Sequence, residues 1–308
     1  MIDSRKKLAW QLALAASSVA VSSAALAAQP EWEGTVGAGA IYSPDYLGSD
    51  DYEWNAWPSL DATYGDTFFV SVTDGVGWNV IKQDNWRVAP FIGYTFGRDD
   101  TGDIDDLDQV DGGATAGLRV SYLDDAWRYS AAAETPFSGD IDGYRVRFKA
   151  THITKLGERA VFTIGPRFGY TSADWTDDLF GVSNRESARS GIDAYDPSNG
   201  YFTVGGEASL SYYLTRQWSV TGLVGVSRLT GDAADSSIVD DIGDATQWRA
   251  GLSSTTIFKL CLKNRRAMAR QGKNRRKSGV YREVNEPFEP IFNAVWASAG
   301  IFQTKRKS

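Results

Sequence analysis

The feature that most constrains this chain is an alternation of apolar and polar residues with a period of two. In the segment 86–96, one face carries six apolar residues, from Trp86 to Phe96. The segment 143–152 repeats the alternation, with Tyr144, Val146 and Phe148 on one face and basic residues on the other. A period of two indicates a strand with one apolar face, and about ten residues suffice for a tilted strand to cross a membrane. The pattern therefore predicts an all-β fold.

The lengths of the connections between these segments distinguish a membrane barrel from a soluble sandwich. Outer-membrane barrels have short periplasmic turns, longer outer loops and an even number of strands. Short connections are predicted at 65–66, 123–125, 155–158 and 215–216, and long ones at 98–111, 172–199 and 230–246; the connections 43–53 and 137–142 fall on the same side as the long ones. A first count gives an odd number of strands, and dividing 67–82 at the hairpin dipeptide Asp74-Gly75 makes it even. We predict a transmembrane antiparallel β-barrel of about 12 strands, within a range of roughly 10–12.

Tryptophan placement supports the barrel. Six tryptophans lie at or near the start of a predicted strand, where interfacial girdles belong: Trp32, Trp54, Trp86, Trp127, Trp218 and Trp248. The alternative is a soluble β-sandwich in which these side chains anchor the core. A polar lumen and polar loops also account for a mean hydropathy of −0.33 in a membrane protein.

The first residues have the order of a secretory signal peptide. Arg5, Lys6 and Lys7 precede an apolar stretch that begins at Leu8, and small residues end at Ala27. Charged, apolar and small-residue regions in this order predict export. A membrane anchor is the alternative, but the apolar run is short for a span of about 30 Å. We assign 1–27 to the signal peptide and 28–258 to the barrel.

The last segment, 259–308, has a different composition. It holds 13 Lys and Arg residues against three Glu, a net charge of +10, whereas 29–258 holds 16 basic and 35 acidic residues, a net charge of −19. The single cysteine, Cys261, also lies there. One interpretation is a periplasmic arm that binds anionic envelope polymers or acidic proteins. The other is a disordered extension produced by a frameshift or read-through, because residue usage changes just after Phe258.

The outer loops are rich in aspartate. The segment 98–111 holds the candidate ligands of a hard cation, namely Asp99, Asp103, Asp105 and Asp108. Dense carboxylates suit Ca²⁺ or Mg²⁺, although the spacing is not that of an EF-hand. The alternative is a solvated acidic surface beside lipopolysaccharide bridged by divalent cations.

A second set of charged residues falls on the polar faces of neighbouring strands. This predicted lumen cluster comprises Arg119, Arg128, Arg145, Arg147, Lys149, Arg167, Glu134 and Glu207. Buried charge is unfavourable unless it is paired or hydrated. The cluster predicts either a lumen closed by salt bridges or a positively biased channel that selects anions.

No constellation in the sequence predicts catalysis. The only histidine, His152, lies at a strand end on the outward face, and no G-x-S-x-G motif is present. A nucleophile needs a positioned base, so we expect a non-enzymatic protein without a cofactor.

Several motifs make the chain similar to the MipA/OmpV family of Gram-negative outer-membrane proteins. The most specific is the run that contains Gly231, Asp232, Ala233, Ala234, Asp235 and Ser236, and it departs from the family pattern at Ser237, where proline is expected. Others are the segment 43–49, Gly97-Arg98 and the segment 180–183. The resemblance covers about 29–258 and implies a β-barrel. The protein after which the family is named is regarded as a scaffold for a murein lytic transglycosylase and a murein-synthesising enzyme.

These observations predict an integral outer-membrane scaffold for murein-remodelling enzymes. The resemblance implies a periplasmic murein hydrolase and a murein synthase as partners, and the barrel implies contact with outer-membrane lipid and lipopolysaccharide, with no nucleic acid. The alternatives are a narrow channel or ligand-binding porin for small or cationic solutes, and an adhesin that acts through the acidic outer loops. Residues 259–308 are expected on the periplasmic side.

Overall fold

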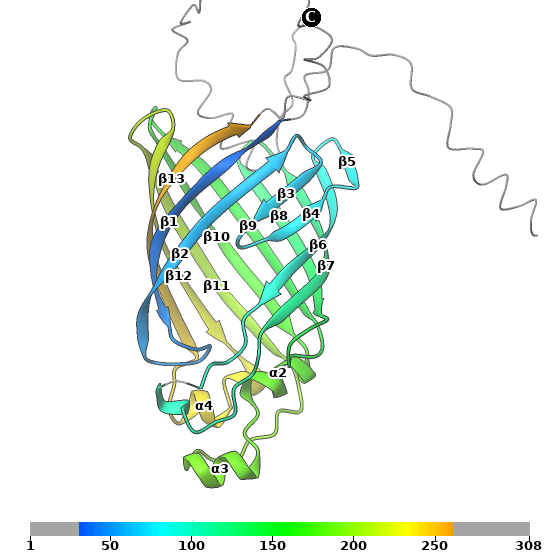
Figure 1. Cartoon of the computed structure of the whole chain (residues 1–308), viewed down its shortest axis with the longest axis vertical. Helices are drawn as coiled ribbons and strands as arrows, with labels where there is room; N and C mark the ends of the chain where they lie inside the picture. Colours follow the sequence, from blue (N-terminus) through cyan, green and yellow to red (C-terminus); the bar gives the residue numbers. More distant parts are fainter. Residues whose placement is uncertain (1–30, 101, 261–308) are drawn as a thin grey trace, which may run out of the picture. The chain divides into compact units, whose positions relative to one another are not determined.

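The computed structural model describes residues 31–100 and 102–260, which form one antiparallel sheet rolled into a barrel (Figure 1). The predicted signal peptide, and all but the first two residues of the predicted extension, lie outside this range. The strands are β1 (Trp32–Pro44), β2 (Tyr52–Tyr64), β3 (Phe68–Ser71), β4 (Gly75–Trp78), β5 (Ile81–Gln83), β6 (Trp86–Thr95), β7 (Gly113–Leu123), β8 (Trp127–Pro136), β9 (Arg145–Leu156), β10 (Ala160–Thr171), β11 (Tyr201–Tyr213), β12 (Trp218–Leu229) and β13 (Thr246–Leu260).

The sheet closes through a strand that is interrupted once. Both β4 and β5 pair with β6, but their registers differ by one residue, so they are two parts of one strand separated by a bulge. The bulge lies opposite Pro90 of β6, which has no N–H to donate to the ladder. Counting β4 and β5 together gives a closed barrel of 12 strands, which confirms the prediction. Gly75 begins β4 with a φ of 75°, as the predicted hairpin requires.

Short turns and long loops lie at opposite ends of the barrel. β1 begins opposite the end of β13, where Trp32 pairs with Leu260, and the short turns share this end. The long connections 96–112, 172–200 and 230–245 gather at the other end with the helices (Figure 1). With the polarity of outer-membrane barrels, the turns face the periplasm and the loops face outward.

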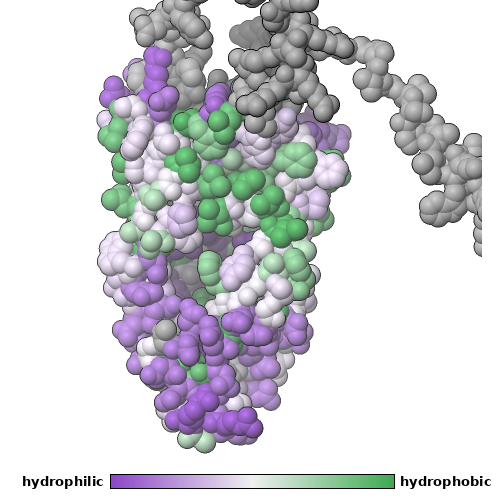
Figure 2. All heavy atoms as spheres, viewed as in Figure 1, coloured by the Kyte–Doolittle hydropathy of each residue, from purple (hydrophilic) through white to green (hydrophobic). Residues whose placement is uncertain are grey.

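The outward face carries an apolar band between two aromatic girdles. Ring pairs near the turns include Trp32–Tyr64 and Trp86–Tyr122, and pairs near the loops include Tyr42–Trp54 and Tyr170–Phe202. Ten residues of tilted strand separate Tyr64 from Trp54, which corresponds to about 23 Å across the membrane. Figure 2 shows the apolar surface toward the turn end and a hydrophilic surface over the loops.

The long loops fold into a plug with its own apolar core. Three helices contribute, α2 (Ala173–Phe180), α3 (Asn184–Ser190) and α4 (Ser237–Asp240), with two short 3-10 turns, η1 (Gly102–Ile104) and η2 (Gly231–Ala233). One cluster packs Trp175, Phe180 and Val239 against the strand-end residues Tyr201 and Leu229, and another centres on Ile104 and Ile238. No helix in the described part of the chain is long and apolar enough to cross a membrane.

The plug core predicts a large effect for a substitution at its centre. Phe180 is 0% exposed, so Phe180→Ala should lower the free energy of unfolding by about 3–5 kcal/mol through lost burial and a cavity. Urea titration of the refolded barrel, followed by tryptophan fluorescence, measures the change. Phe137→Ala is the matched control, because Phe137 is exposed and its loss should change stability by less than about 0.5 kcal/mol. Equal effects of the two substitutions would show that the plug is not packed as described.

Candidate functional site

The eight charged residues of the predicted lumen cluster lie on the inward faces of β7 to β11, where the alternation along each strand directs them into the barrel. Two of the carboxylates organise most of the ion pairs. Glu134, only 4% exposed, forms ion pairs with Arg145 at 2.8 Å and Arg147 at 3.0 Å, and accepts a hydrogen bond from the Thr115 hydroxyl at 3.0 Å. A carboxylate this buried is stable because cations and a donor surround it.

The second carboxylate, Glu207 on β11, links the adjacent strand β10 and the next-but-one strand β13 on the lumen face. Arg167 of β10 lies 2.6 Å from one oxygen, and Arg249 of β13 lies 2.7 Å from the other. Sequence reasoning missed Arg249, although the alternation along β13 places it opposite the outward-facing Trp248. It also missed Asp61, which alternation along β2 places on the face opposite to Trp54. It missed Asp74 because nothing in the sequence of a hairpin turn predicts that its carboxylate enters the lumen.

Asp74 lies at the tip of the β3–β4 hairpin and forms an ion pair with Arg119 of β7 at 3.0 Å. The guanidinium of Arg119 also lies 4.0 Å from the centre of the Phe69 ring, in cation–π geometry. The hairpin is therefore fastened to the inside of the barrel by its tip and by its first strand.

The lumen carries more positive than negative charge. One cavity of the lumen is lined by four cations (Arg87, Arg119, Arg128, Lys149) and three carboxylates (Asp61, Asp74, Glu207), an excess of one positive charge. Within the described residues, no ion pair includes Arg128 or Lys149. The volume of this cavity is about 380 Å³. The arrangement combines a salt-bridge network with a positively charged cavity, the two features that the sequence left as alternatives.

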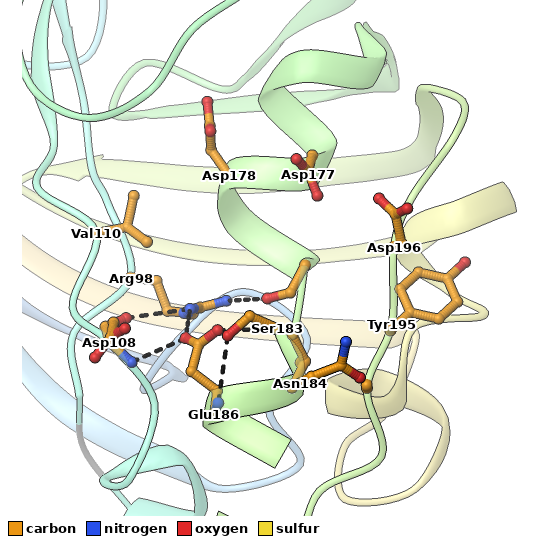
Figure 3. A pocket seen from close by; sticks show the side chains of 13 residues that line it. Arg98, Asp108, Val110, Asp177, Asp178, Ser183, Asn184, Glu186, Tyr195 and Asp196 are labelled. Carbon is orange, nitrogen blue, oxygen red and sulfur yellow. Dashed lines mark hydrogen bonds and ion pairs between the residues drawn. The ribbon is translucent and has the colours of Figure 1, made fainter. Parts of the chain in front are cut away.

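A second cavity, of about 580 Å³, lies among the outer loops (Figure 3). Arg98 lies in its wall, buried at 5% exposure. Its guanidinium donates to the carbonyl oxygens of Leu179 at 2.7 Å and Asp108 at 3.1 Å, and lies 3.7 Å from the Glu186 carboxylate. Burial lowers the pKa of Arg98, while Glu186 opposes that shift. Arg98 thus ties together three outer-loop segments.

Glu186, in α3, makes hydrogen bonds beside Arg98 that join the same outer-loop segments. Its carboxylate accepts from the backbone N–H of Ser183 at 2.8 Å and of Asp108 at 3.1 Å, and Ser183 Oγ accepts from the Glu186 N–H. Burial acts to raise the pKa of Glu186, but the hydrogen bonds with Ser183 and Asp108 and the charge of Arg98 outweigh it, so the pKa lies below its usual value. The spacing Ser183-x-x-Glu186 is a capping-box signature that could have identified this helix start in the sequence.

The acidic outer-loop residues do not converge. Asp99, Asp103 and Asp105 are exposed, and Asp108 lies 2.9 Å from Arg189. Within residues 31–100 and 102–260, no group of three or more His, Cys, Asp or Glu side chains is arranged to hold a metal ion. Asp177 and Asp178, which line the outer-loop cavity, have raised pKa values because of partial burial and then neighbouring aspartates.

The run Gly231–Ser236 is a structural element of the plug. The Asp232 carboxylate accepts from the N–H groups of Ser198 at 2.8 Å and Asn199 at 2.7 Å, which joins two outer loops. Gly231 has a φ of 59°, where other residues are strained. Ala233 and Ser236 are fully buried, Ser236 donates to the Ala233 carbonyl at 3.0 Å, and Ala234 and Asp235 complete the turn before α4.

His152 makes local contacts on the outward face. Its Nδ1 lies 3.1 Å from the Thr154 hydroxyl, and its ring packs edge-on against Trp127 at 4.8 Å. These contacts place His152 in the aromatic girdle near the turns.

The buried network predicts unequal effects for two carboxylate substitutions. Glu134→Gln should lower the free energy of unfolding by about 3–5 kcal/mol, because it leaves Arg145 and Arg147 without their counter-charge. Asp108→Asn, which removes an exposed pair, should change it by at most about 1 kcal/mol. Urea titration in detergent micelles compares the two. A Glu134→Gln barrel as stable as the unmodified protein would contradict the assigned pairing.

Glu186 predicts a pH-dependent plug. Because its pKa is lower in the folded protein than in the unfolded chain, its contribution is complete above the unfolded-state value of about 4.3 and is lost as the pH falls through the folded value. Glu186→Gln should therefore be less stable than the unmodified protein at pH 7, and the difference in stability should narrow as the pH falls below about 4.3. Asp177 and Asp178 titrate in both proteins, so the comparison removes their contribution. A gap that persists unchanged in acid would contradict the assignment.

A family model described as MltA-interacting protein MipA matches residues 36–258. The MltA-interacting proteins of Escherichia coli strain K12 and Shigella flexneri are each 27% identical over 262 residues, covering 81% of this chain and 99% of theirs. Among solved structures, the NanC porin aligns with a TM-score of 0.41 at 10% identity over 72% of this chain and 98% of its own. An outer-membrane channel from Pseudomonas putida F1 aligns with a TM-score of 0.36 at 11% identity over 78% and 100%. The chain is an integral β-barrel of the outer-membrane type, and it belongs to the MipA family.

Proposed function

We propose that this protein is a non-enzymatic outer-membrane adaptor that holds a murein lytic transglycosylase, together with a murein synthase, at the periplasmic surface. Family membership supports the first partner, since the relatives carry the name MltA-interacting protein. The second partner rests on the resemblance of the chain to the family. Contact with outer-membrane lipid and lipopolysaccharide accompanies the barrel.

The plug in the outer mouth of the barrel is the main observation that supports the proposal. Trp175 and Phe180 are buried against strand-end residues, and the Arg145 guanidinium of the lumen lies 4.8 Å from the Trp175 ring centre. The lumen is thus covered from the outside by packed side chains. In a barrel closed in this way, the turn end is the surface that a periplasmic partner can bind.

The periplasmic rim carries an exposed acidic patch. Asp84 in the turn before β6, and Asp124 and Asp125 in the turn before β8, lie on neighbouring turns, because β6 pairs with β7 along its length. We name these three residues the rim patch. Complementary charge steers association and fixes orientation, so the rim patch fits a partner with a basic surface.

A channel is the second candidate, and the excess positive charge of the lumen favours it for anions over cations. The plug opposes it, because ions would have to pass through packed loops. An adhesin would act through the exposed aspartates of the outer loops, such as Asp103 and Asp105.

Affinity capture tests the adaptor role. The full chain is captured from mildly crosslinked envelopes with an unrelated barrel of similar size as control, and a lytic transglycosylase or a murein synthase should be enriched. Asp84→Asn/Asp124→Asn/Asp125→Asn should reduce the yield, whereas Asp103→Asn/Asp105→Asn/Asp106→Asn, a matched charge change in an outer loop, should leave it unchanged. Capture of assembly factors and lipopolysaccharide alone would contradict the proposal.

A further inference from the structure

The barrel wall is incomplete between β2 and β6. β2 pairs with β1 along its length, but only its last four residues, Asp61–Tyr64, pair with β3. β6 pairs with β7 along its length, but its last three residues, Gly93–Thr95, pair with no other strand in the described chain. The hairpin of β3 and β4 is too short to fill the wall, so 52–59 and 93–95 border an opening. Figure 1 shows the hairpin ending part-way along the barrel, and Figure 2 shows the surface hollowed on this face.

The opening lies in the loop-side half of the apolar band. Trp54 and Tyr94 on its two borders belong to the girdle near the loops, and the hairpin tip at Asp74 forms its other limit. With the loops facing outward, this half of the band lies in the outer leaflet. Hydrocarbon offers no hydrogen bonds, so unpaired main-chain groups at this depth require water from the lumen or a polar ligand.

The main chain of β2 is adapted to an open edge. The Leu60 carbonyl accepts from the Val72 N–H, and alternate residues of a strand direct their main-chain groups to the same side. Ala56 and Pro58 therefore direct theirs into the opening, and Pro58 has no N–H to leave unpaired. Proline on an edge also disfavours addition of another strand. This makes a pairing strand from a partner a poor occupant.

The two sides of the opening differ in chemistry. Its outer rim is apolar and exposed, formed by Trp54, Val72, Val76, Ile92, Tyr94 and Phe96. On the lumen side of the β3–β4 hairpin, which limits the opening, lies the positively charged cavity, whose lining includes the hairpin residues Ser71 and Asp74 and the two cations without an ion pair, Arg128 and Lys149. An apolar rim beside a cationic chamber is complementary to a molecule with an anionic head and acyl chains.

We propose that the opening is a lateral binding site for an anionic lipid of the surrounding leaflet. The headgroup enters the lumen toward Arg128 and Lys149, and the acyl chains remain in the membrane against Trp54 and Tyr94. The headgroup supplies the counter-charge that the lumen lacks, and it reaches the cavity from the membrane because the plug covers the outer mouth. This site goes beyond the adaptor role and does not depend on it.

Binding of short-chain lipids to the refolded full chain tests the site. In neutral detergent, dioctanoyl phosphatidylglycerol should bind more tightly than dioctanoyl phosphatidylcholine, and glycerol phosphate alone should bind more weakly than the lipid. Arg128→Gln/Lys149→Gln should weaken phosphatidylglycerol binding about tenfold or more, through loss of charge-assisted contacts. Lys82→Gln/Lys259→Gln, a matched change at the periplasmic rim, should leave the Kd unchanged. Unaltered binding by the lumen variant, or equal binding of glycerol phosphate, would overturn the proposal.

Photo-crosslinking locates the lipid without removing a charge. Trp57 lies on the lumen face of β2 at the opening, and Ser209 lies on the lumen face of β11 in the closed wall. Trp57→p-benzoyl-phenylalanine should form lipid adducts in vesicles, and Ser209→p-benzoyl-phenylalanine should not. Heat-modifiable migration in gels establishes that both variants are folded. Equal lipid yields, or an adduct with a protein strand at Trp57, would contradict a lateral lipid site.

Discussion

Every main-chain N–H and C=O group of a strand within the membrane needs a hydrogen-bond partner, and this requirement shapes the barrel. A strand in hydrocarbon must find a partner on each side, and most of this barrel satisfies that requirement through continuous antiparallel pairing. The seam between β4, β5 and β6 is where regular pairing weakens, since Pro90 introduces a bulge and the β3–β4 hairpin stops short. Pro58 lies on the exposed edge that results. The two prolines therefore relate the local sequence directly to the one interruption in the wall.

The charge inside the barrel results from rolling the sheet into a closed wall. Alternation directs every second residue inward, and a lumen of this width brings cations of neighbouring strands close together. Glu134 and Glu207 each hold two arginines, which stabilises much of this charge. The excess positive charge that remains is what distinguishes the lumen from a fully neutralised core. Because the loops pack over the outer mouth, the proposed route to this charge is the opening in the wall.

Much of the barrel could be predicted from the sequence, because a period of two fixes both the strand and the face of each residue. Alternation indicated the inward charges of β7 to β11, and a glycine-containing dipeptide indicated the β3–β4 hairpin. The plug was not predictable, since its contacts join Asp232 to Ser198 and Arg98 to Leu179, pairs far apart in the chain with no local period. The inward position of Asp74 and the gap beside Pro58 depend on the length of a neighbouring hairpin, which residue patterns specify poorly.

Packed loops cover the outer mouth of the lumen, and we propose that the barrel acts at the periplasmic surface and at its lateral opening. Planar bilayer recording of the refolded full chain tests whether the lumen is closed. We expect no steady conductance across the membrane at neutral pH, because Trp175 and Phe180 pack with strand-end residues in the outer mouth of the barrel. A steady, ohmic and anion-selective current from the unmodified protein would contradict it.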